Sequence, residues 1–226
     1  SETLAREVEN VRNNLGLLDS STLGKILVKG PDAGKFLDLI YTNKLSTLPI
    51  GKCRYGLMCT EAGFVFDDGV VARLTSDSFL CHTTSGGSDR VYAWLEEWLQ
   101  TEWFDFQVYV SNLTEQYSQF AVVGPNSRKL LQRFKGINLI DRKLPFMHFV
   151  EGFMDKIWVR IYRISFSGEL SYELAVKSND AAQLWEKLIN KGNDLNLMPY
   201  GTEALHILRA EKGFIVVGDE TDGTVT

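Results

Sequence analysis

Two stretches of the chain, VKGPDAGKFL at residues 28–37 and VVGPNSRKLL at residues 122–131, are nearly the same sequence. Five of the ten positions are identical, and the pair Asp32/Asn126 is close to isosteric. In each stretch an apolar strand ends at Gly-Pro, and proline is well tolerated in the first turn of a helix. Each stretch therefore predicts a passage from a strand into a helix, and the two passages lie 94 residues apart.

The same order of elements follows each passage. Three strands and then a helix are expected each time, at 54–60, 64–74, 78–84 and 90–99 and again at 148–153, 157–164, 171–176 and 181–189. Such a unit gives an antiparallel sheet with helices on one face. We therefore predict an α+β fold of two tandem related α/β units, residues 1–112 and 113–226. A chance match between two common helix entries is the alternative.

The composition restricts the possible partners and compartment. With 44% hydrophobic residues the chain is an ordinary globular protein, and its net charge of -5 gives no basic surface for nucleic acid. No apolar run approaches the length that spans a bilayer, so no membrane partner is expected. Cys53, Cys59 and Cys81 lack pairing motifs, which indicates reduced thiols and a cytoplasmic location. The three histidines stand far apart, so no metal site is predicted.

Acidic residues interrupt two apolar strands. Asp67 and Asp68 lie inside FVFDDGVV, and one of them should face inward because neighbours on a strand point to opposite faces. A bulge that turns both acids to water is the alternative. Glu173 lies inside SYELAV, where a solvated outer face is the alternative. Two strand acids, one from each unit, would suit a ligand rich in N–H donors.

Three longer runs resemble the folate-dependent aminomethyltransferase family, which includes the T-protein of the glycine cleavage system. These runs are VRNNLGLLDSSTLGKILVKGPDA, YTNKLSTLPIGKCRYGLMCTEAGFVFDDGVV and RAEKGFIVVGDETDGTVT. The segments KCRYGLM, TTSGGSDRV and WLQTEW are most similar to the branch of the family that is found in the α subunit of heterotetrameric sarcosine oxidase. The resemblance implies a fold whose third domain, a C-terminal barrel, is absent from this chain.

The resemblance also implies which residues form the folate pocket. Asp68 matches the family's essential aspartate and is expected to be catalytic, near the N5/N10 edge of tetrahydrofolate. Glu173 matches the glutamate that holds the pterin ring, whose N–H donors suit carboxylate acceptors. Phe166 stands where the family has a tyrosine, so one hydroxyl is lost. The other matching pocket positions are Tyr55, Thr83, Thr84 and Arg209.

The function implied by this resemblance is capture of the one-carbon unit of sarcosine oxidation on tetrahydrofolate, forming 5,10-methylenetetrahydrofolate. Flavins and NAD are then expected on other domains or subunits, and the other sarcosine oxidase subunits are the expected partners. The alternatives are an aminomethyltransferase of the glycine cleavage system, the C-terminal half of a dimethylglycine dehydrogenase, or a folate-binding module without catalysis.

Overall fold

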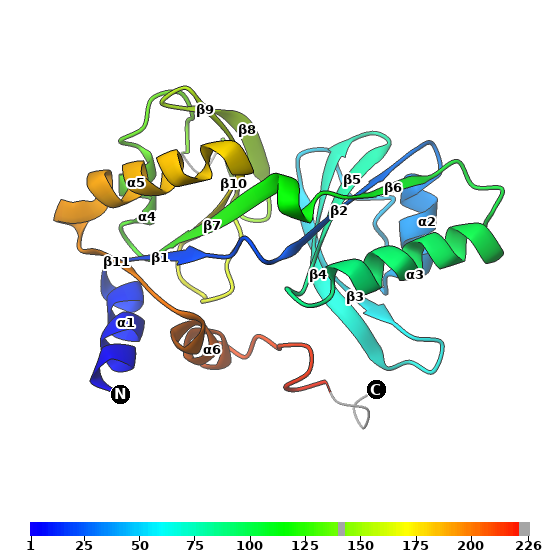
Figure 1. The fold of residues 1–226 in the computed structure, drawn as a ribbon, viewed down its shortest axis with the longest axis horizontal. Coiled ribbons are helices and arrows are strands. Elements are labelled where there is room, and N and C mark those ends of the chain that lie inside the picture. The colour runs from blue at the N-terminus through cyan, green and yellow to red at the C-terminus, as the bar shows by residue number, and fades with distance from the viewer. Residues whose placement is uncertain (140–142, 222–226) are drawn as a thin grey trace. The chain divides into compact units, whose positions relative to one another are not determined.

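The computed structural model describes residues 1–139 and 143–221, and the last five residues of the tail GDETDGTVT lie outside them. Figure 1 shows the described residues as helices packed on two sheets. None of the described helices is long and apolar enough to cross a membrane.

The α-helices are α1 (Glu2–Asn13), α2 (Ala33–Ile40), α3 (Ser88–Thr101), α4 (Ser127–Leu131), α5 (Ala181–Gly192) and α6 (Thr202–Ala210). The strands are β1 (Leu15–Asp19), β2 (Gly24–Lys29), β3 (Cys53–Cys59), β4 (Val65–Thr75), β5 (Ser78–Thr83), β6 (Tyr109–Asn112), β7 (Tyr117–Val123), β8 (Phe149–Met154), β9 (Ile157–Tyr162), β10 (Ser171–Lys177) and β11 (Leu197–Pro199).

The chain divides into two compact units, which are named here by their sheets. The six-stranded unit consists of Ser1–Ser21 and Glu115–Phe214, and the five-stranded unit consists of Thr22–Thr114 with the residues from Ile215 onward. The predicted division at 112/113 thus differs from the observed one at both chain ends. The reason at the N-terminus is that β1 pairs with β7 and β11, far along the chain, and not with its neighbour β2.

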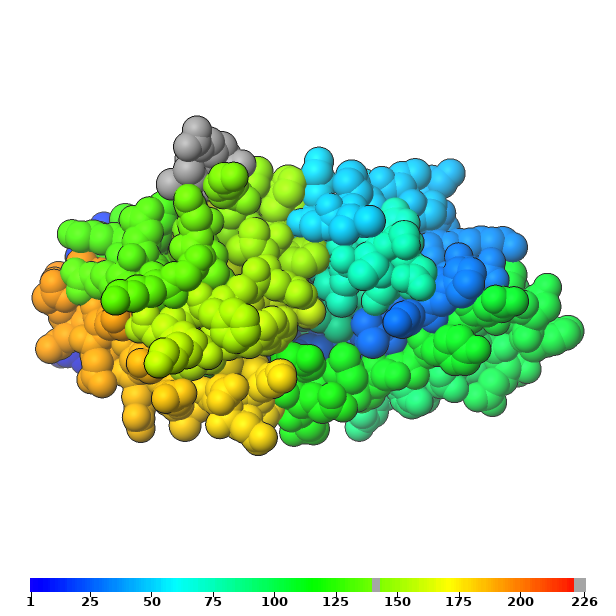
Figure 2. All heavy atoms as spheres, turned by 90° about the horizontal axis from the view of Figure 1, so that it is seen from above, coloured from blue at the N-terminus to red at the C-terminus, as the bar shows by residue number. Residues whose placement is uncertain are grey.

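The six-stranded sheet has the order β11-β1-β7-β10-β9-β8. One face packs against α4 and α5, where Leu130, Leu131, Leu184 and Leu188 join the buried core. Only one stripe of the amphipathic helix α5 is buried, so its other atoms lie at the surface, yellow to orange in Figure 2. At the β1–β7 end, the other face packs against α1 and α6.

The five-stranded sheet has the order β3-β4-β5-β2-β6. Apolar side chains of β2, β4 and β5 alternate toward α2 and α3 and form one buried core there. The opposite face of this sheet carries no helix of its own unit among the described residues, and it includes Asp68 on β4. The position of Asp68 on that face follows from strand alternation, since Asp67 and Val71 lie on the helix side.

The two Gly-Pro junctions have the same conformation, which confirms the predicted duplication. Gly30 follows β2 with φ +140°, and Gly124 follows β7 with φ +121°. Asp32 and Asn126 then have φ/ψ of −95°/4° and −89°/1° at the start of α2 and α4. Hydrogen bonds agree as well, because Asp32 N donates to the Gln107 carbonyl, and Asn126 N to the Asn14 carbonyl.

The sheet orders extend the correspondence to every strand of the five-stranded sheet. Reading outward from the junction, β2-β5-β4-β3 corresponds to β7-β10-β9-β8. On the other side, β2 pairs antiparallel with β6 and β7 pairs antiparallel with β1. The position that β6 fills from later in the chain is therefore filled by β1 from the start of the chain. This exchange of one strand explains why the units are not consecutive halves.

Candidate functional site

Asp68 and Tyr55 form a hydrogen-bonded pair on the five-stranded sheet. Asp68 on β4 is opposite Leu57 of β3, and Tyr55 lies two residues earlier on β3 and therefore on the same face. The Tyr55 hydroxyl donates to Asp68 Oδ2 at 2.6 Å. Burial raises the pKa of Asp68, the bond from Tyr55 opposes this rise, and the charge of Asp67 adds to it. Asp68 is thus a half-buried carboxylate with a raised pKa, held in place by a phenol.

Asp67 has a different environment on the opposite face. Its carboxylate has no exposed surface and accepts hydrogen bonds from Thr84 N at 3.0 Å, Thr84 Oγ1 at 2.9 Å and Asp68 N at 2.8 Å. The predicted alternation of the two acids is confirmed, and the alternative that both face water is wrong. The more deeply buried acid is Asp67, which anchors a turn, whereas Asp68 keeps part of its surface exposed.

Thr83 and Thr84 stand at the end of β5, close to this pair. The Thr83 hydroxyl is buried and donates to the Thr84 carbonyl at 2.9 Å. The Thr84 hydroxyl donates to Asp67, and a Gly87 N–H bond to the Thr84 carbonyl closes the following turn. Both hydroxyls therefore serve the local structure, and their predicted contact with a ligand stays a prediction.

Glu173 lies on β10 of the six-stranded sheet, between Ala121 of β7 and Tyr162 of β9. Its Oε2 accepts a hydrogen bond from the amide of Gln119, which is fully buried. Burial, with the charge of Glu173 as a second cause, raises the pKa of the Tyr200 hydroxyl. Glu173 is thus partly buried, with polar groups of this unit around it. A buried carboxylate needs such hydrogen-bond partners to offset the loss of water.

The six-stranded unit also contains an open groove of about 460 Å³. Phe166 and Arg209 lie next to it, since the Phe166 ring packs at 5.9 Å against Phe214 and Arg209 Nη1 donates to the Phe214 carbonyl at 3.2 Å. Neither these two residues nor Glu173 lines the groove itself. The residues that line it include Phe146, Arg163, Ser165, Glu169, Ser171 and Phe214.

Glu169 is the groove acid that the sequence analysis missed. It ends a tight turn in which Ser165 Oγ donates to the Glu169 carbonyl at 2.8 Å and the Ser167 side chain accepts from Glu169 N at 3.2 Å. Gly168 has φ +80°, and a Cβ there would lie 2.6 Å from the Lys212 side chain. The serine-rich run SFSGE directly before a predicted strand was the available signal, because such side chains fix turns.

Comparisons with known proteins give one family over the whole chain. The family model described as "GCVT N-terminal domain" matches residues 1–226. The chain is 51% identical to the sarcosine oxidase subunit alpha of Corynebacterium sp. (strain P-1), over 98% of this chain but 23% of the relative. It is 34% identical to the aminomethyltransferase of Halothermothrix orenii, over 97% of this chain and 60% of the relative. In the crystal structure of the glycine cleavage system aminomethyltransferase T from Bartonella henselae, the similar chain is 28% identical with a TM-score of 0.82, over 94% of this chain and 55% of that one. The chain thus spans about a quarter of the sarcosine oxidase α subunit that it matches.

Proposed function

Because the chain belongs to the GCVT N-terminal domain family, we propose that it is a tetrahydrofolate-binding module that captures the one-carbon unit of sarcosine oxidation as 5,10-methylenetetrahydrofolate. The observation on which this proposal depends most is Asp68, a half-buried carboxylate with a raised pKa, bonded to Tyr55 at 2.6 Å. Perturbed acids of this kind gather at functional sites. The similarity to a sarcosine oxidase subunit supports the choice of amine.

The carboxylate acceptors of the chain fit a reduced pterin. The rim of that ring presents N–H groups, and Glu173 and Glu169 offer carboxylate acceptors in the six-stranded unit. Phe146 and Phe214 add apolar walls to a groove whose volume lies within the range of small-molecule sites. Glu173 is the acceptor expected from the sequence, and Glu169 is the acceptor that lines the groove.

The chemical role proposed for Asp68 is proton transfer. Tetrahydrofolate, when bound, supplies two amine nitrogens that take up carbon at the oxidation level of formaldehyde. With a raised pKa, the Asp68 carboxylate holds a proton more readily than an ordinary aspartate and so serves better as a general base. Tyr55 fixes its orientation. We assign amine oxidation, with its flavin and NAD, to other domains or subunits of the complete enzyme.

The variant Asp68→Asn tests this role in the full-length enzyme. Amine oxidation should continue at its normal rate, while formation of the folate product falls by about 100-fold or more, with free formaldehyde in its place. Oxygen consumption, free formaldehyde and 5,10-methylenetetrahydrofolate are measured together. A normal rate of folate product would remove Asp68 from the mechanism. Tetrahydrofolate binding without any folate product in the unaltered enzyme would favour the non-catalytic folate-binding module.

The two candidate pterin acceptors are separated by matched variants. Glu169→Gln and Glu173→Gln each keep the size of the side chain and remove its charge. The variant at the residue that holds the ring should bind tetrahydrofolate about tenfold more weakly by calorimetry, since a charged hydrogen bond is lost. If both variants bind normally, neither acid holds the ring. Glu186→Gln, on α5, is the control.

A further inference from the structure

We propose that Arg12 is a positioning residue for the groove, which fixes the Glu169 carboxylate in the wall of the groove. This inference rests on the proposed binding of tetrahydrofolate. Arg12 is near the end of α1 and does not itself line the groove. It acts, in this proposal, entirely through the residues that it holds.

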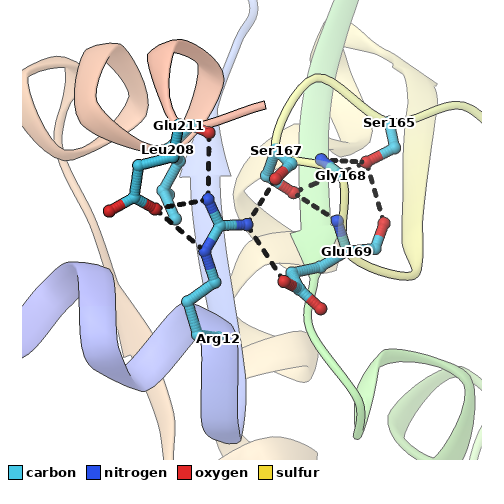
Figure 3. A network of polar contacts seen from close by, with 7 residues as sticks. All are labelled: Arg12, Ser165, Ser167, Gly168, Glu169, Leu208 and Glu211. Carbon is cyan, nitrogen blue, oxygen red and sulfur yellow. Dashed lines mark hydrogen bonds and ion pairs between the residues drawn. The ribbon is translucent and has the colours of Figure 1, made fainter. Parts of the chain in front are cut away.

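The guanidinium of Arg12 joins three segments that are far apart in the sequence (Figure 3). Nη1 donates to the Ser167 carbonyl and, at 3.0 Å, to Glu169 Oε1. Nη2 donates to the Leu208 carbonyl at 3.0 Å and to Glu211 Oε2 at 2.7 Å. The turn before β10 and the C-terminal end of α6 are thus held by a single planar group on α1.

Both segments that Arg12 holds continue into the wall of the groove. On one side, Gly168 and Glu169, the two residues after the bonded carbonyl of Ser167, line the groove. On the other, the end of α6 leads to Phe214, whose N–H donates to the Arg209 carbonyl at 3.1 Å. Arg12 therefore bonds both the turn that carries the groove acid and the helix end that precedes Phe214, and the effect on binding is assigned to the first of these, through Glu169.

The contact with Arg12 uses only one oxygen of the Glu169 carboxylate. Oε2 accepts no hydrogen bond from any residue that the structure describes, and the side chain keeps 23% of its surface exposed. A ligand in the groove can therefore donate to Oε2 while Arg12 holds Oε1. An arginine suits this task because its rigid fork of donors reaches two carboxylates and two carbonyls together, which a lysine ammonium cannot do in the same geometry.

The experiment is a double-mutant cycle on tetrahydrofolate binding in the full-length, assembled enzyme. Arg12→Gln, Glu169→Gln and the double variant are compared by calorimetry, with thermal unfolding as a check of folding. Arg133→Gln is the matched control, because Arg133 also bonds a carboxylate, Asp194, and a carbonyl in the same unit but away from the groove. Arg12→Lys tests how far a positive charge alone restores affinity.

Arg12→Gln should weaken binding by about tenfold, and the double variant should be no weaker than Glu169→Gln, since Arg12 acts through that residue. Arg12→Lys should recover part of the affinity and Arg133→Gln should bind normally. Multiplication of the two single effects in the double variant, or normal affinity of a folded Arg12→Gln enzyme, would overturn the inference and leave the proposed function intact. If the unaltered enzyme binds no tetrahydrofolate, the proposed function fails and the inference falls with it.

Discussion

Neighbouring aspartates in β4 show how the environment decides the use of an acid. Asp67 accepts four hydrogen bonds in a fully buried position, the longest from Arg90 at 3.5 Å, whereas Asp68 faces the other side with one phenol donor. The alternating pattern of a strand predicts that one acid faces inward. It does not predict which acid is buried more deeply, because the burial of Asp67 depends on the turn at Thr84, which comes after the next strand.

The bond from Tyr55 should set the acidic limit of activity. It lowers the pKa of Asp68 against the larger effect of burial, so its loss raises that pKa further. Tyr55→Phe should therefore lose more rate of folate-product formation at about pH 6 than at about pH 8, as more Asp68 is protonated. A pH–rate profile of the full-length enzyme checks this. Tyr109→Phe, an exposed tyrosine of the same unit, should keep the original profile.

The charge of Asp68 should reduce stability at neutral pH. Because burial raises its pKa in the folded state, the stability it contributes is present at low pH and lost as pH rises through that pKa. Asparagine carries no charge at any pH, so the Asp68→Asn variant does not lose this stability and should unfold about 2 °C higher than the parent at about pH 8. The difference should vanish at about pH 4, where Asp68 is protonated in the parent. Thermal melts without ligand give the result, and an equal difference at both pH values would contradict it.

At the scale of elements, the repeated Gly-Pro junctions are what the sequence reveals best. The strands and helices after each junction lie where the periodicity predicts them, within a few residues. β1 was not predicted as a strand, since the apolar run at 15–19 directly follows a helix and its pairing partners are more than 100 residues away. Local patterns contain no information on such pairing.

Alanine at either junction should be costly. A Cβ on Gly30 would lie 2.1 Å from the Gln107 carbonyl oxygen, and one on Gly124 would lie 2.7 Å from that of Asn14, both at positive φ. Gly30→Ala and Gly124→Ala should each lower the free energy of unfolding by about 3 kcal/mol. Gly86→Ala, where no atom lies within 4 Å, should change it by about 0.5 kcal/mol or less. Urea unfolding measures all three variants. If one junction variant kept the parent's free energy of unfolding, the two Gly-Pro junctions would not be equivalent.

At the scale of the whole chain, one unit interrupts the other. All strands and helices of the five-stranded unit lie between β2 and β6, whereas the six-stranded sheet needs β1 from before this stretch. Arg12, which bonds the groove acid Glu169, also comes from before this stretch. Such dependence is invisible to motif analysis, because it joins segments through tertiary pairing alone.

Separate fragments should therefore differ in their ability to fold. Residues 22–114 contain a complete sheet with its two helices, and a fragment of this range should give dispersed amide signals by NMR. Residues 115–214 lack β1, which lies between β7 and β11, and should stay poorly dispersed until a peptide of residues 1–21 is added. A well-folded 115–214 fragment without the peptide would contradict this.

The strand exchange also affects how the chain folds while it is being synthesised. A growing chain emerges from its N-terminal side, so β1 is outside before its partner β7 has been translated. About 100 residues separate them, which takes roughly 5–20 s at ordinary elongation rates. During that wait the apolar segment LGLLD has no partner strand, while the intervening unit is already complete enough to fold. A nascent chain stalled near residue 114 should therefore expose the apolar segment of β1 to chaperones that bind such segments. A pause in translation at this point would lengthen the exposure.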